Sequence, residues 1–487
     1  MKLGKHIFGV GAMTGISRIF GFVRDMLIAR YLGAGRLSDI FLAAFKLPNL
    51  FRDLLGEGAL SAIFIPMYTD KKKDQNFAQN VFSWLMLVLL GLTLVFEIFM
   101  PGVIWILAPG FADDPGKMQM TVTISRIMFG YVIFVCGAAF LTAVLNAFSR
   151  FFLAAFMPVL LNIMLIIAMV LAAPLAPVTI LYVMAVTVVL SGVIQCAILW
   201  GRVRQKHFGL RLVRPRWTPG IRQMLKRFGV SIVGSGFYQI TIIVGTLVAS
   251  FQNGAVSWLY YADRIVQLPF AMIGLAVGTV LMSSISNALA DGNMRSVHIQ
   301  QNSSMRRSLM LIIPCVVGLV VLAEPIIRYL FQYGAWTSES THAVAVAIMI
   351  QAFVLPAMLV SQIYSKTLYA AQDVVTPVRT SMISLGTATL IYLGAFPFVG
   401  YLAISIGVVF SGYLKNYLLG RACRRRNLVH IDGRTIRATA GFAVLAGAVG
   451  VGLWFMPMTN IFALGGGIAA YAVIYLPVAR VIDRRIK

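Results

Sequence analysis

The sequence predicts an all-α polytopic membrane protein with about 14 transmembrane helices, arranged as two pseudo-symmetric six-helix lobes plus two C-terminal helices. Of its 487 residues, 59% are hydrophobic and only 12% are charged, and the mean hydropathy is +0.86. A soluble chain carries about a quarter charged residues. The apolar residues come in long blocks, such as 81–107 and 153–173. Such blocks suffice to cross a bilayer, which takes roughly 20 residues, and they lack the polar faces of helices in a soluble enzyme.

Glycine, proline and charged residues divide the apolar sequence into fourteen predicted spans. These are 7–32, 37–67, 80–107, 122–148, 153–173, 178–200, 228–251, 257–289, 308–332, 341–371, 378–397, 400–420, 438–456 and 459–479. An even number of spans places both termini on the same side of the membrane. The N-terminus shows no small-residue cleavage site, so we expect no removable signal peptide.

The basic residues predict which side that is. Of the 41 Lys and Arg residues, 29 lie in the termini and the even-numbered loops, whereas the odd-numbered loops hold only Arg36 and Lys117. Cytoplasmic loops are enriched in Lys and Arg, so both termini are expected in the cytoplasm. The same distribution accounts for the net charge of +25 without nucleic acid as a partner.

No pattern in the sequence predicts a metal, a cofactor or an enzyme. The four cysteines are scattered without paired spacing, and the five histidines lie far apart. Neither set indicates a disulfide framework or a zinc site. There is no phosphate-binding glycine loop and no nucleophile motif, and Asp113-Asp114 with Lys117 is interpreted as a solvated turn of an outer loop.

Two short matches indicate an internal repeat of six spans. Lys46-Leu47-Pro48 recurs as Gln267-Leu268-Pro269, and Leu145-Asn146-Ala147 recurs as Leu368-Tyr369-Ala370, at offsets of 221 and 223 residues. Parallel repeats of this kind occur among alternating-access transporters. The predicted domains are therefore an N-lobe (1–202), a cytoplasmic linker (203–227), a C-lobe (228–422) and two C-terminal helices (423–487), which could form a groove for a lipid tail.

The first two spans hold an unusual number of charged residues. Span 1 contains Arg18, Arg24, Asp25 and Arg30, and span 2 contains Asp39, Lys46, Arg52, Asp53 and Glu57. Each ionisable residue at mid-bilayer costs about 2.5–3.5 kcal/mol, so these helices should face one another or water. Internal ion pairing is the favoured interpretation for Asp25, Lys46 and Asp53. For Arg18, Arg24 and Arg52 we expect an unpaired cationic surface instead.

Span 8 begins with a related group, Tyr260-Tyr261-Ala262-Asp263-Arg264. Asp263 is the expected local partner of Arg264. Guanidinium groups bind phosphate through bidentate, charge-assisted hydrogen bonds, so arginines from both halves indicate a polyanionic substrate such as a diphosphate. Pro48 and Pro269 predict helix breaks inside spans 2 and 8, which either line a cavity or are simple kinks.

Several long motifs resemble one family closely. They are Met13-Thr14-Gly15-Ile16-Ser17-Arg18-Ile19-Phe20-Gly21-Phe22-Val23-Arg24-Asp25, Leu32-Gly33-Ala34-Gly35, Ser38-Asp39, Ala44-Phe45-Lys46-Leu47-Pro48-Asn49-Leu50, Arg52, Glu57-Gly58-Ala59, Ala108-Pro109-Gly110-Phe111, Ser257-Trp258-Leu259-Tyr260-Tyr261-Ala262-Asp263-Arg264 and Phe331-Gln332-Tyr333-Gly334. The chain thus resembles the MurJ (MviN) lipid II flippases of the multidrug/oligosaccharidyl-lipid/polysaccharide exporter superfamily over essentially its whole length.

The resemblance implies a function and a set of site residues. A flippase of this family would carry lipid II, undecaprenyl-diphosphate-MurNAc-pentapeptide-GlcNAc, from the cytoplasmic to the outer leaflet of the bacterial inner membrane by alternating access. The substrate-binding residues implied are Arg18, Arg24, Arg52 and Arg264, and the functional carboxylate implied is Asp39. From the positions of the charges themselves, we expect gating or ion-pair support from Asp39 together with Asp25, Lys46, Glu57 and Asp263. Membrane lipids and the peptidoglycan synthesis machinery are the further partners expected. The pattern departs at Gln267, where some relatives carry glutamate, and at Gln362 and Lys366.

Other functions remain alternatives at this point. A flippase for another undecaprenyl-diphosphate-linked polysaccharide unit would use the same cationic interior. A drug or cation antiporter of the same superfamily would need carboxylates and aromatic side chains in place of four interior arginines. A membrane-embedded transferase would need a metal or an acid–base pair in a loop, and a scaffold would not need buried charge.

Overall fold

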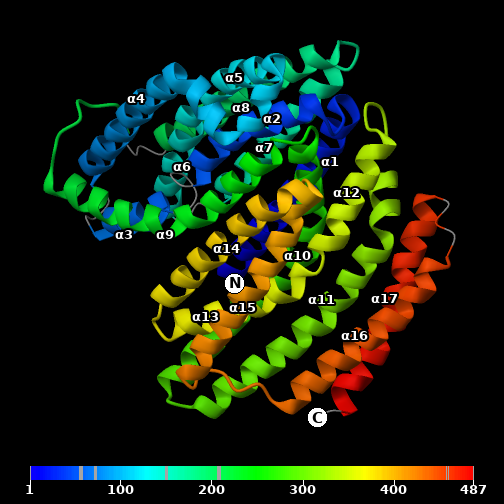
Figure 1. The fold of residues 1–487 in the computed structure, drawn as a ribbon. Helices are drawn as coiled ribbons and strands as arrows, with labels where there is room; N and C mark the ends of the chain where they lie inside the picture. Colours follow the sequence, from blue (N-terminus) through cyan, green and yellow to red (C-terminus); the bar gives the residue numbers. More distant parts are fainter. Residues whose placement is uncertain are drawn as a thin grey trace. The chain divides into compact units, whose positions relative to one another are not determined.

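The computed structural model describes residues 2–53, 59–70, 74–148, 152–205, 210–456, 458 and 460–485. Within these ranges the chain forms seventeen α-helices and one short 3-10 helix, and no β-strand (Figure 1). The all-α prediction is confirmed.

The helices are long and follow one another closely. The first half contains α1 (Lys2–Leu32), α2 (Arg36–Phe51), α3 (Ala59–Asp70), α4 (Gln75–Leu107), the 3-10 helix η2 (Pro109–Asp113), α5 (Pro115–Phe129), α6 (Tyr131–Ala147), α7 (Phe152–Leu171) and α8 (Pro177–Gln205). The second half contains α9 (Pro219–Ala249), α10 (Ala255–Ala290), α11 (Met294–Phe331), α12 (Ser338–Gln351), α13 (Val354–Ala370), α14 (Val375–Val399), α15 (Leu402–Arg425), α16 (Gly433–Trp454) and α17 (Ile461–Arg485).

Each of the fourteen predicted spans coincides with one helix or with two consecutive helices. Spans 2, 4 and 10 are the double ones, formed by α2 with α3, α5 with α6, and α12 with α13. Among the described residues, eight segments are long and apolar enough to cross a membrane when α5 and α6 are taken as one, or nine if α12 and α13, which meet at 42°, also form one span. The chain is therefore a polytopic membrane protein.

Local sequence explains where several helices begin and bend. Asp74, Asp114, Thr218, Asn293, Thr337 and Asp432 are N-caps whose side chains accept a hydrogen bond from a backbone N–H two or three residues on. Such caps satisfy the unpaired donors of a first helical turn. The two prolines predicted to break helices differ in effect. Helix α2 ends three residues after Pro48 and passes into a π turn at Arg52 and Asp53, whereas α10 runs through Pro269 without interruption.

The chain divides into two compact units, which we call unit 1 (residues 1–256 and 333–336) and unit 2 (257–332 and 337–487). In unit 1, α1 packs against α7, α2 against α5, α6 against both α3 and α8, and α9 against α3 and α4. The unit thus includes α9, which the sequence assigns to the C-lobe. The lobe boundaries at 203–227 and 422 stay a prediction.

Helix pairings in unit 2 resemble those of unit 1. The α13–α15, α14–α15 and α11–α12 contacts correspond, six spans on, to the α6–α8, α7–α8 and α4–α5 contacts. This recurrence agrees with the repeat suggested by the sequence. Helix α16 packs against α11 and α17, so the C-terminal pair joins unit 2 along α11 (Figure 1).

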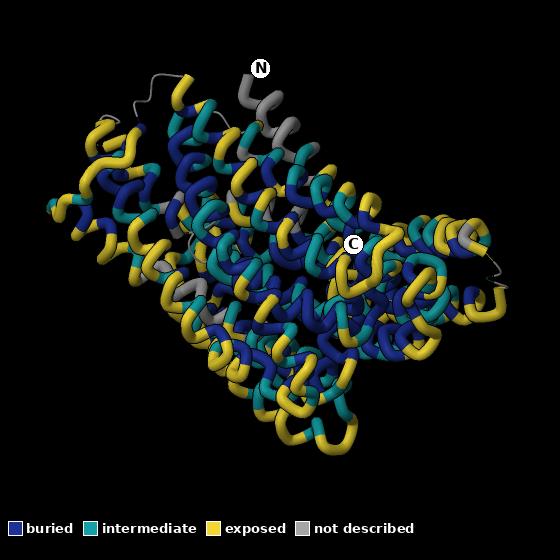
Figure 2. Tube along the Cα trace, turned by 90° about the horizontal axis from the view of Figure 1, so that it is seen from above, coloured by how far each residue is buried: buried dark blue, intermediate teal, exposed yellow. Residues whose placement is uncertain are grey.

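Buried and exposed residues alternate along individual helices (Figure 2). Helix α4 buries Leu89 and Ile104 completely but leaves Ile98 69% and Phe99 63% exposed. An exposed face of large apolar side chains is rare in soluble proteins. Such a face is expected where a helix contacts the hydrocarbon of a membrane.

Candidate functional site

The charged residues of α1 fall into an exposed and a buried group. Arg18 is exposed, whereas Arg24 is 7% and Asp25 1% exposed. Arg24 donates from Nη2 and Nε to Asp25 Oδ1, at 2.7 and 3.0 Å. Its Nη1 donates to Asn162 Oδ1 of α7 at 3.0 Å. The expectation of an unpaired cationic surface is therefore wrong for Arg24, which pairs with its neighbour on the same helix.

Asn162 fixes the guanidinium of Arg24 from a second helix. Its Nδ2 donates to the backbone carbonyl of Ser17 at 3.3 Å while its Oδ1 accepts from Arg24. Both halves of the amide therefore bind α1, which packs along α7. The sequence gives no hint of this contact, because the two residues are 138 positions apart. A polar residue in the otherwise apolar span 5 was the only available signal.

The charges at the end of α2 are paired as well. Arg52 Nη2 lies 3.1 Å from Asp53 Oδ1, with side chains 26% and 37% exposed. The second carboxylate oxygen of Asp53 accepts from Gln239 Nε2 of α9 at 3.2 Å. An unpaired surface is thus wrong for Arg52 too, since Arg52 pairs with its neighbour Asp53. Glu57, assigned to gating or ion pairing, lies outside the described residues.

Lys46, for which the sequence favours an ion pair, binds a neutral partner. Its Nζ donates to Thr246 Oγ1 of α9. Together with Gln239, this threonine places polar groups of α9 against the charged face of α2. Sequence analysis missed both, because uncharged polar residues in spans are common and carry little signal on their own.

Asp39 forms a buried ion pair that the sequence did not predict. This carboxylate is fully buried, and its Oδ2 lies 2.8 Å from Lys117 Nζ, whose residue is only 4% exposed. The interpretation of Lys117 as part of a solvated turn is wrong. Asp114 does form a half-exposed pair with Arg36 at 3.1 Å, and it also caps α5. The turn is therefore solvated at Asp114 but not at Lys117.

In unit 2, Arg264 is exposed near the start of α10. Its Nε and Nη2 donate to Tyr260 Oη at 3.3 and 3.2 Å, and its guanidinium carbon lies 5.3 Å from the centre of the same ring. Asp263, the expected partner of Arg264, accepts from Gln267 Nε2. Tyr260 thus orients the arginine from one helical turn away.

The described residues hold no group of three or more His, Cys, Asp or Glu side chains placed to bind a metal ion. What unit 1 does assemble is a set of guanidinium groups on α1 and α2, of which Arg24 and Arg52 are oriented by neighbouring oxygen atoms. Such groups can bind phosphate oxygens without further proton transfer, because their charge is permanent.

Comparison with known proteins gives concordant results. The family described as "Lipid II flippase MurJ" matches residues 28–472. The chain is 35% identical over 501 residues to a "Probable lipid II flippase MurJ" of Rhizobium meliloti, covering 98% of this chain and 94% of that one. It is 32% identical to a protein of the same description from Rickettsia prowazekii, covering 86% and 83%.

Solved structures agree on the fold. A lipid II flippase MurJ in an inward closed conformation superposes with a TM-score of 0.84 at 22% identity, covering 98% of this chain and 99% of the other. An inward-facing multidrug transporter of the MATE family superposes with a TM-score of 0.68 at 14% identity, covering 84% and 94%.

Proposed function

The chain belongs to the MurJ family of lipid II flippases, and from this premise we propose that its interior arginines bind the diphosphate of the lipid-linked substrate. The protein is a multi-pass transporter of the bacterial inner membrane and not an enzyme. It moves lipid II for peptidoglycan synthesis. Neither a polysaccharide-unit flippase nor a drug antiporter is favoured, because the family match extends from residue 28 to 472.

The position of Arg24 carries this proposal. It is a nearly buried guanidinium in a membrane-spanning helix, held by Asp25 on its own helix and by Asn162 on α7. A group oriented in advance loses little conformational entropy when it binds a ligand. Permanent charge in a site of low dielectric constant also interacts more strongly than in water. Arg24 is therefore suited to a diphosphate whose head group must leave the aqueous phase.

Arg18, Arg52 and Arg264 are the other arginines we assign to the substrate. Arg18 is exposed on α1, two helical turns before Arg24. Arg52 shares its carboxylate partner with Gln239, so a phosphate that competes for the guanidinium leaves Asp53 with one hydrogen bond in place. Arg264 lies in unit 2, where Tyr260 orients it. Asp25 and Asp263 act as supports that orient neighbouring groups.

The test uses single substitutions and two measurements. Arg24→Ala, Arg52→Ala and Arg264→Ala should each abolish complementation of a flippase-deficient strain and flipping of lipid II in liposomes, with membrane levels unchanged. Arg328→Ala is the matched control, since Arg328 also lies in a long apolar helix but pairs with Glu324 at an exposed position. Normal growth with any two of the three variants would refute the assignment.

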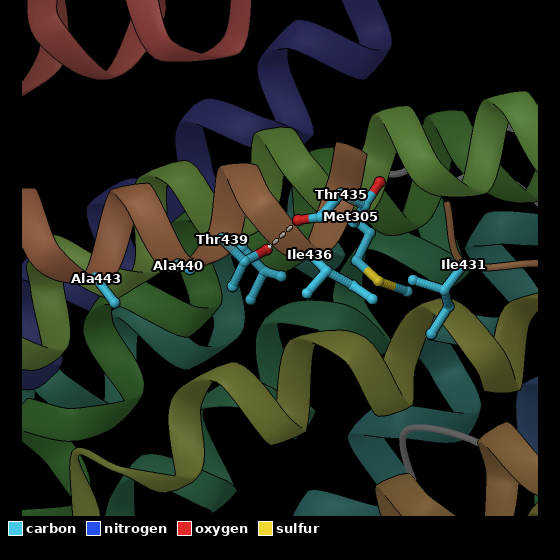
Figure 3. Close-up of a pocket in the computed structure, with 8 residues that line it drawn as sticks. Met305, Ile431, Thr435, Ile436, Thr439, Ala440 and Ala443 are labelled. Atoms are coloured by element: carbon cyan, nitrogen blue, oxygen red, sulfur yellow. Dashed lines mark hydrogen bonds between the residues drawn. The ribbon is translucent and has the colours of Figure 1, made fainter. Parts of the chain in front are cut away.

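We further propose that α16 and α17 carry the polyprenyl tail while the head group crosses inside. A tail withdrawn from the bilayer would lose about 0.8 kcal/mol for each buried methylene, so it needs an apolar path. An apolar groove of about 420 Å³ lies between α11 and α16, where Met305 and Leu309 face Ile436, Ala440 and Ala443 (Figure 3). Ala469 and Val473 are exposed on α17, the helix that packs against α16.

The orientation and further partners belong to the same proposal. The 29 basic residues of the termini and even-numbered loops support cytoplasmic termini. Contact with the peptidoglycan synthesis machinery would follow from the shared substrate.

A further inference from the structure

A buried ion pair at one end of unit 1 joins segments that are distant in sequence. Lys117 Nζ lies 2.8 Å from Asp39 Oδ2 and 3.0 Å from Asn253 Oδ1. The same Asp39 oxygen accepts from the backbone N–H of Gly254 at 2.8 Å. Lys117 Nζ also lies 4.1 Å from the centre of the Phe111 ring, a favourable cation–π arrangement. A single charge therefore links α2, η2 with the start of α5, and the turn that precedes α10.

Close backbone contacts surround this pair. Gly110 of η2 donates its N–H to Ser250 Oγ at 2.9 Å, and a Cβ at Gly110 would overlap the backbone of Ser250 and Phe251. Gly33 has a φ of +71°, and a Cβ there would meet the Ala335 carbonyl. Ala335 in turn donates its N–H to the Arg30 carbonyl at 2.8 Å. Glycine is needed where two backbones approach this closely.

All four segments lie at span ends that the charge distribution places outside. Residues near 33–39, 108–117, 250–254 and 333–336 follow spans 1, 3, 7 and 9, which are odd-numbered. Because they meet at one end of unit 1, we call that end the outer end. Two of them, 250–254 and 333–336, come from the second half of the sequence, so their docking closes the outer end with elements from both halves of the chain.

We propose that Lys117 is the latch of this closure: its ion pair with Asp39 holds the 250–254 turn against α2 and η2 until the outer end opens to release the head group. The proposal rests on the transport function proposed above. Lys117 acts through Asp39 and Asn253, and it is a positioning residue that need not touch the substrate.

The burial of the pair indicates which state it stabilises. Removing one partner of a buried pair leaves an uncompensated charge, whereas removing both partners is often nearly neutral. In the closed end neither charge reaches water, since the side chains of Lys117 and Asp39 are 5% and 0% exposed. In an open end water would solvate both. Loss of Lys117 alone should therefore disfavour the closed end and leave the open end almost unchanged.

The same end provides a matched control. Arg36 and Asp114 form a pair of similar length, 3.1 Å, with side chains 47% and 46% exposed. Exposed pairs contribute little because water already solvates them. Arg36→Met should therefore leave the closure intact, although it removes a cation from the same loop region as Lys117→Met.

Access of an impermeant thiol reagent to a buried reporter measures the closure. Thr121 is fully buried one turn below Lys117, to whose carbonyl it donates at 2.7 Å, so Thr121→Cys reports opening of the outer end. Ser191→Cys in α8 is buried as well and reports general loosening. Both are placed in full-length chains whose four native cysteines are replaced by alanine, and labelled in intact cells.

We expect Lys117→Met to raise the labelling rate of Thr121→Cys by about tenfold or more, with Ser191→Cys unchanged. Lys117→Arg should restore slow labelling, and the double variant Asp39→Asn/Lys117→Met should label more slowly than Lys117→Met alone. The latch is refuted if Lys117→Met labels at the wild-type rate, if Arg36→Met has the same effect, or if both reporters rise together. Because labelling needs no substrate, failure of lipid II transport in liposomes would count against the proposed function and leave the latch standing.

Discussion

Arg306 connects the two C-terminal helices to the rest of unit 2, and its replacement by methionine should loosen both. Its Nη1 lies 3.5 Å from Asp432 Oδ2 and its Nε lies 3.4 Å from Asp483 Oδ1. Asp432 is the N-cap of α16 and Asp483 lies in the last turns of α17. One arginine of α11 therefore binds both the N-terminus of α16 and the C-terminal turns of α17.

The size of the effect follows from exposure and distance. The side chain of Arg306 is 16% exposed, and those of Asp432 and Asp483 are 36% and 21% exposed. An exposed ion pair contributes about 0–1 kcal/mol to stability, and removing one partner of a buried pair costs about 3–5 kcal/mol. Half-buried pairs such as these fall between the two. Both contacts are longer than the usual charge-assisted bond, so we take about 1 kcal/mol for each. The total of about 2 kcal/mol corresponds to roughly 25-fold in the opening of the two helix ends.

Asp432 is charged when it makes this contact. Burial raises the pKa of Asp432. Hydrogen bonds from Thr435 and the charges of Arg306 and Arg434 lower it by more, so the pKa lies below its ordinary value. The carboxylate is therefore ionised at neutral pH, where the measurement is made.

Hydrogen–deuterium exchange in lipid nanodiscs measures the opening directly. Arg306→Met should accelerate exchange of amides in the first turns of α16 and the last turns of α17 by roughly 25-fold, and Asp483→Asn by about fivefold. The adjacent Arg307 is exposed, so Arg307→Met should change exchange by less than about twofold. Equal protection in Arg306→Met and the wild type would show that apolar packing against α11 alone holds the pair.

Two further predictions concern orientation and the tail path. Cysteines at Arg214 and Arg425 should resist an impermeant thiol reagent in intact cells, while one at Asp113 should react; labelling at 214 would overturn the assigned topology. Val473→Gln, on the exposed face of α17, should slow lipid II flipping without loss of protein, whereas Leu390→Gln at an equally exposed site of α14 should not; equal rates for both would remove α17 from the tail path.

Hydropathy was sufficient to place the spans because the apolar blocks are long and the punctuation is strong. It could not show that span 10 bends by 42° between α12 and α13. The α12–α13 bend lies just before Pro356, which lacks the N–H that would bind the Ala352 carbonyl. The same residue type at Pro269 leaves α10 continuous. Proline alone therefore does not decide between a break and a continuous helix, since neighbouring groups can satisfy the freed carbonyl.

The charged residues pair either with a neighbour in the chain or with a residue far away in the sequence. Asp25 and Asp53 pair with Arg24 and Arg52, their neighbours in the chain, although from the sequence we expected both arginines to be unpaired. Lys117 and Asp39 are 78 positions apart, in the first turns of α5 and α2, and their proximity depends on how these helices pack. A lysine between two spans is ordinarily solvated, so the sequence alone favours a solvated turn at Lys117.

Arg126 shows why a charge inside a span does not by itself indicate a substrate site. Pro101 of α4 has no N–H, so the carbonyl four residues earlier, that of Glu97, loses its helical donor. The Nε of Arg126 in α5 donates to that carbonyl at 3.2 Å. This arginine therefore satisfies a backbone carbonyl that a proline leaves free in the neighbouring helix. Its position inside a span would, by itself, have suggested anion binding. Arg24 differs because side-chain oxygens orient it, from Asp25 and Asn162, and these can yield to a phosphate without exposing a backbone group. By this criterion Arg24 and Arg52 remain substrate candidates, whereas replacing Arg126 should affect the packing of α4 on α5 before it affects transport.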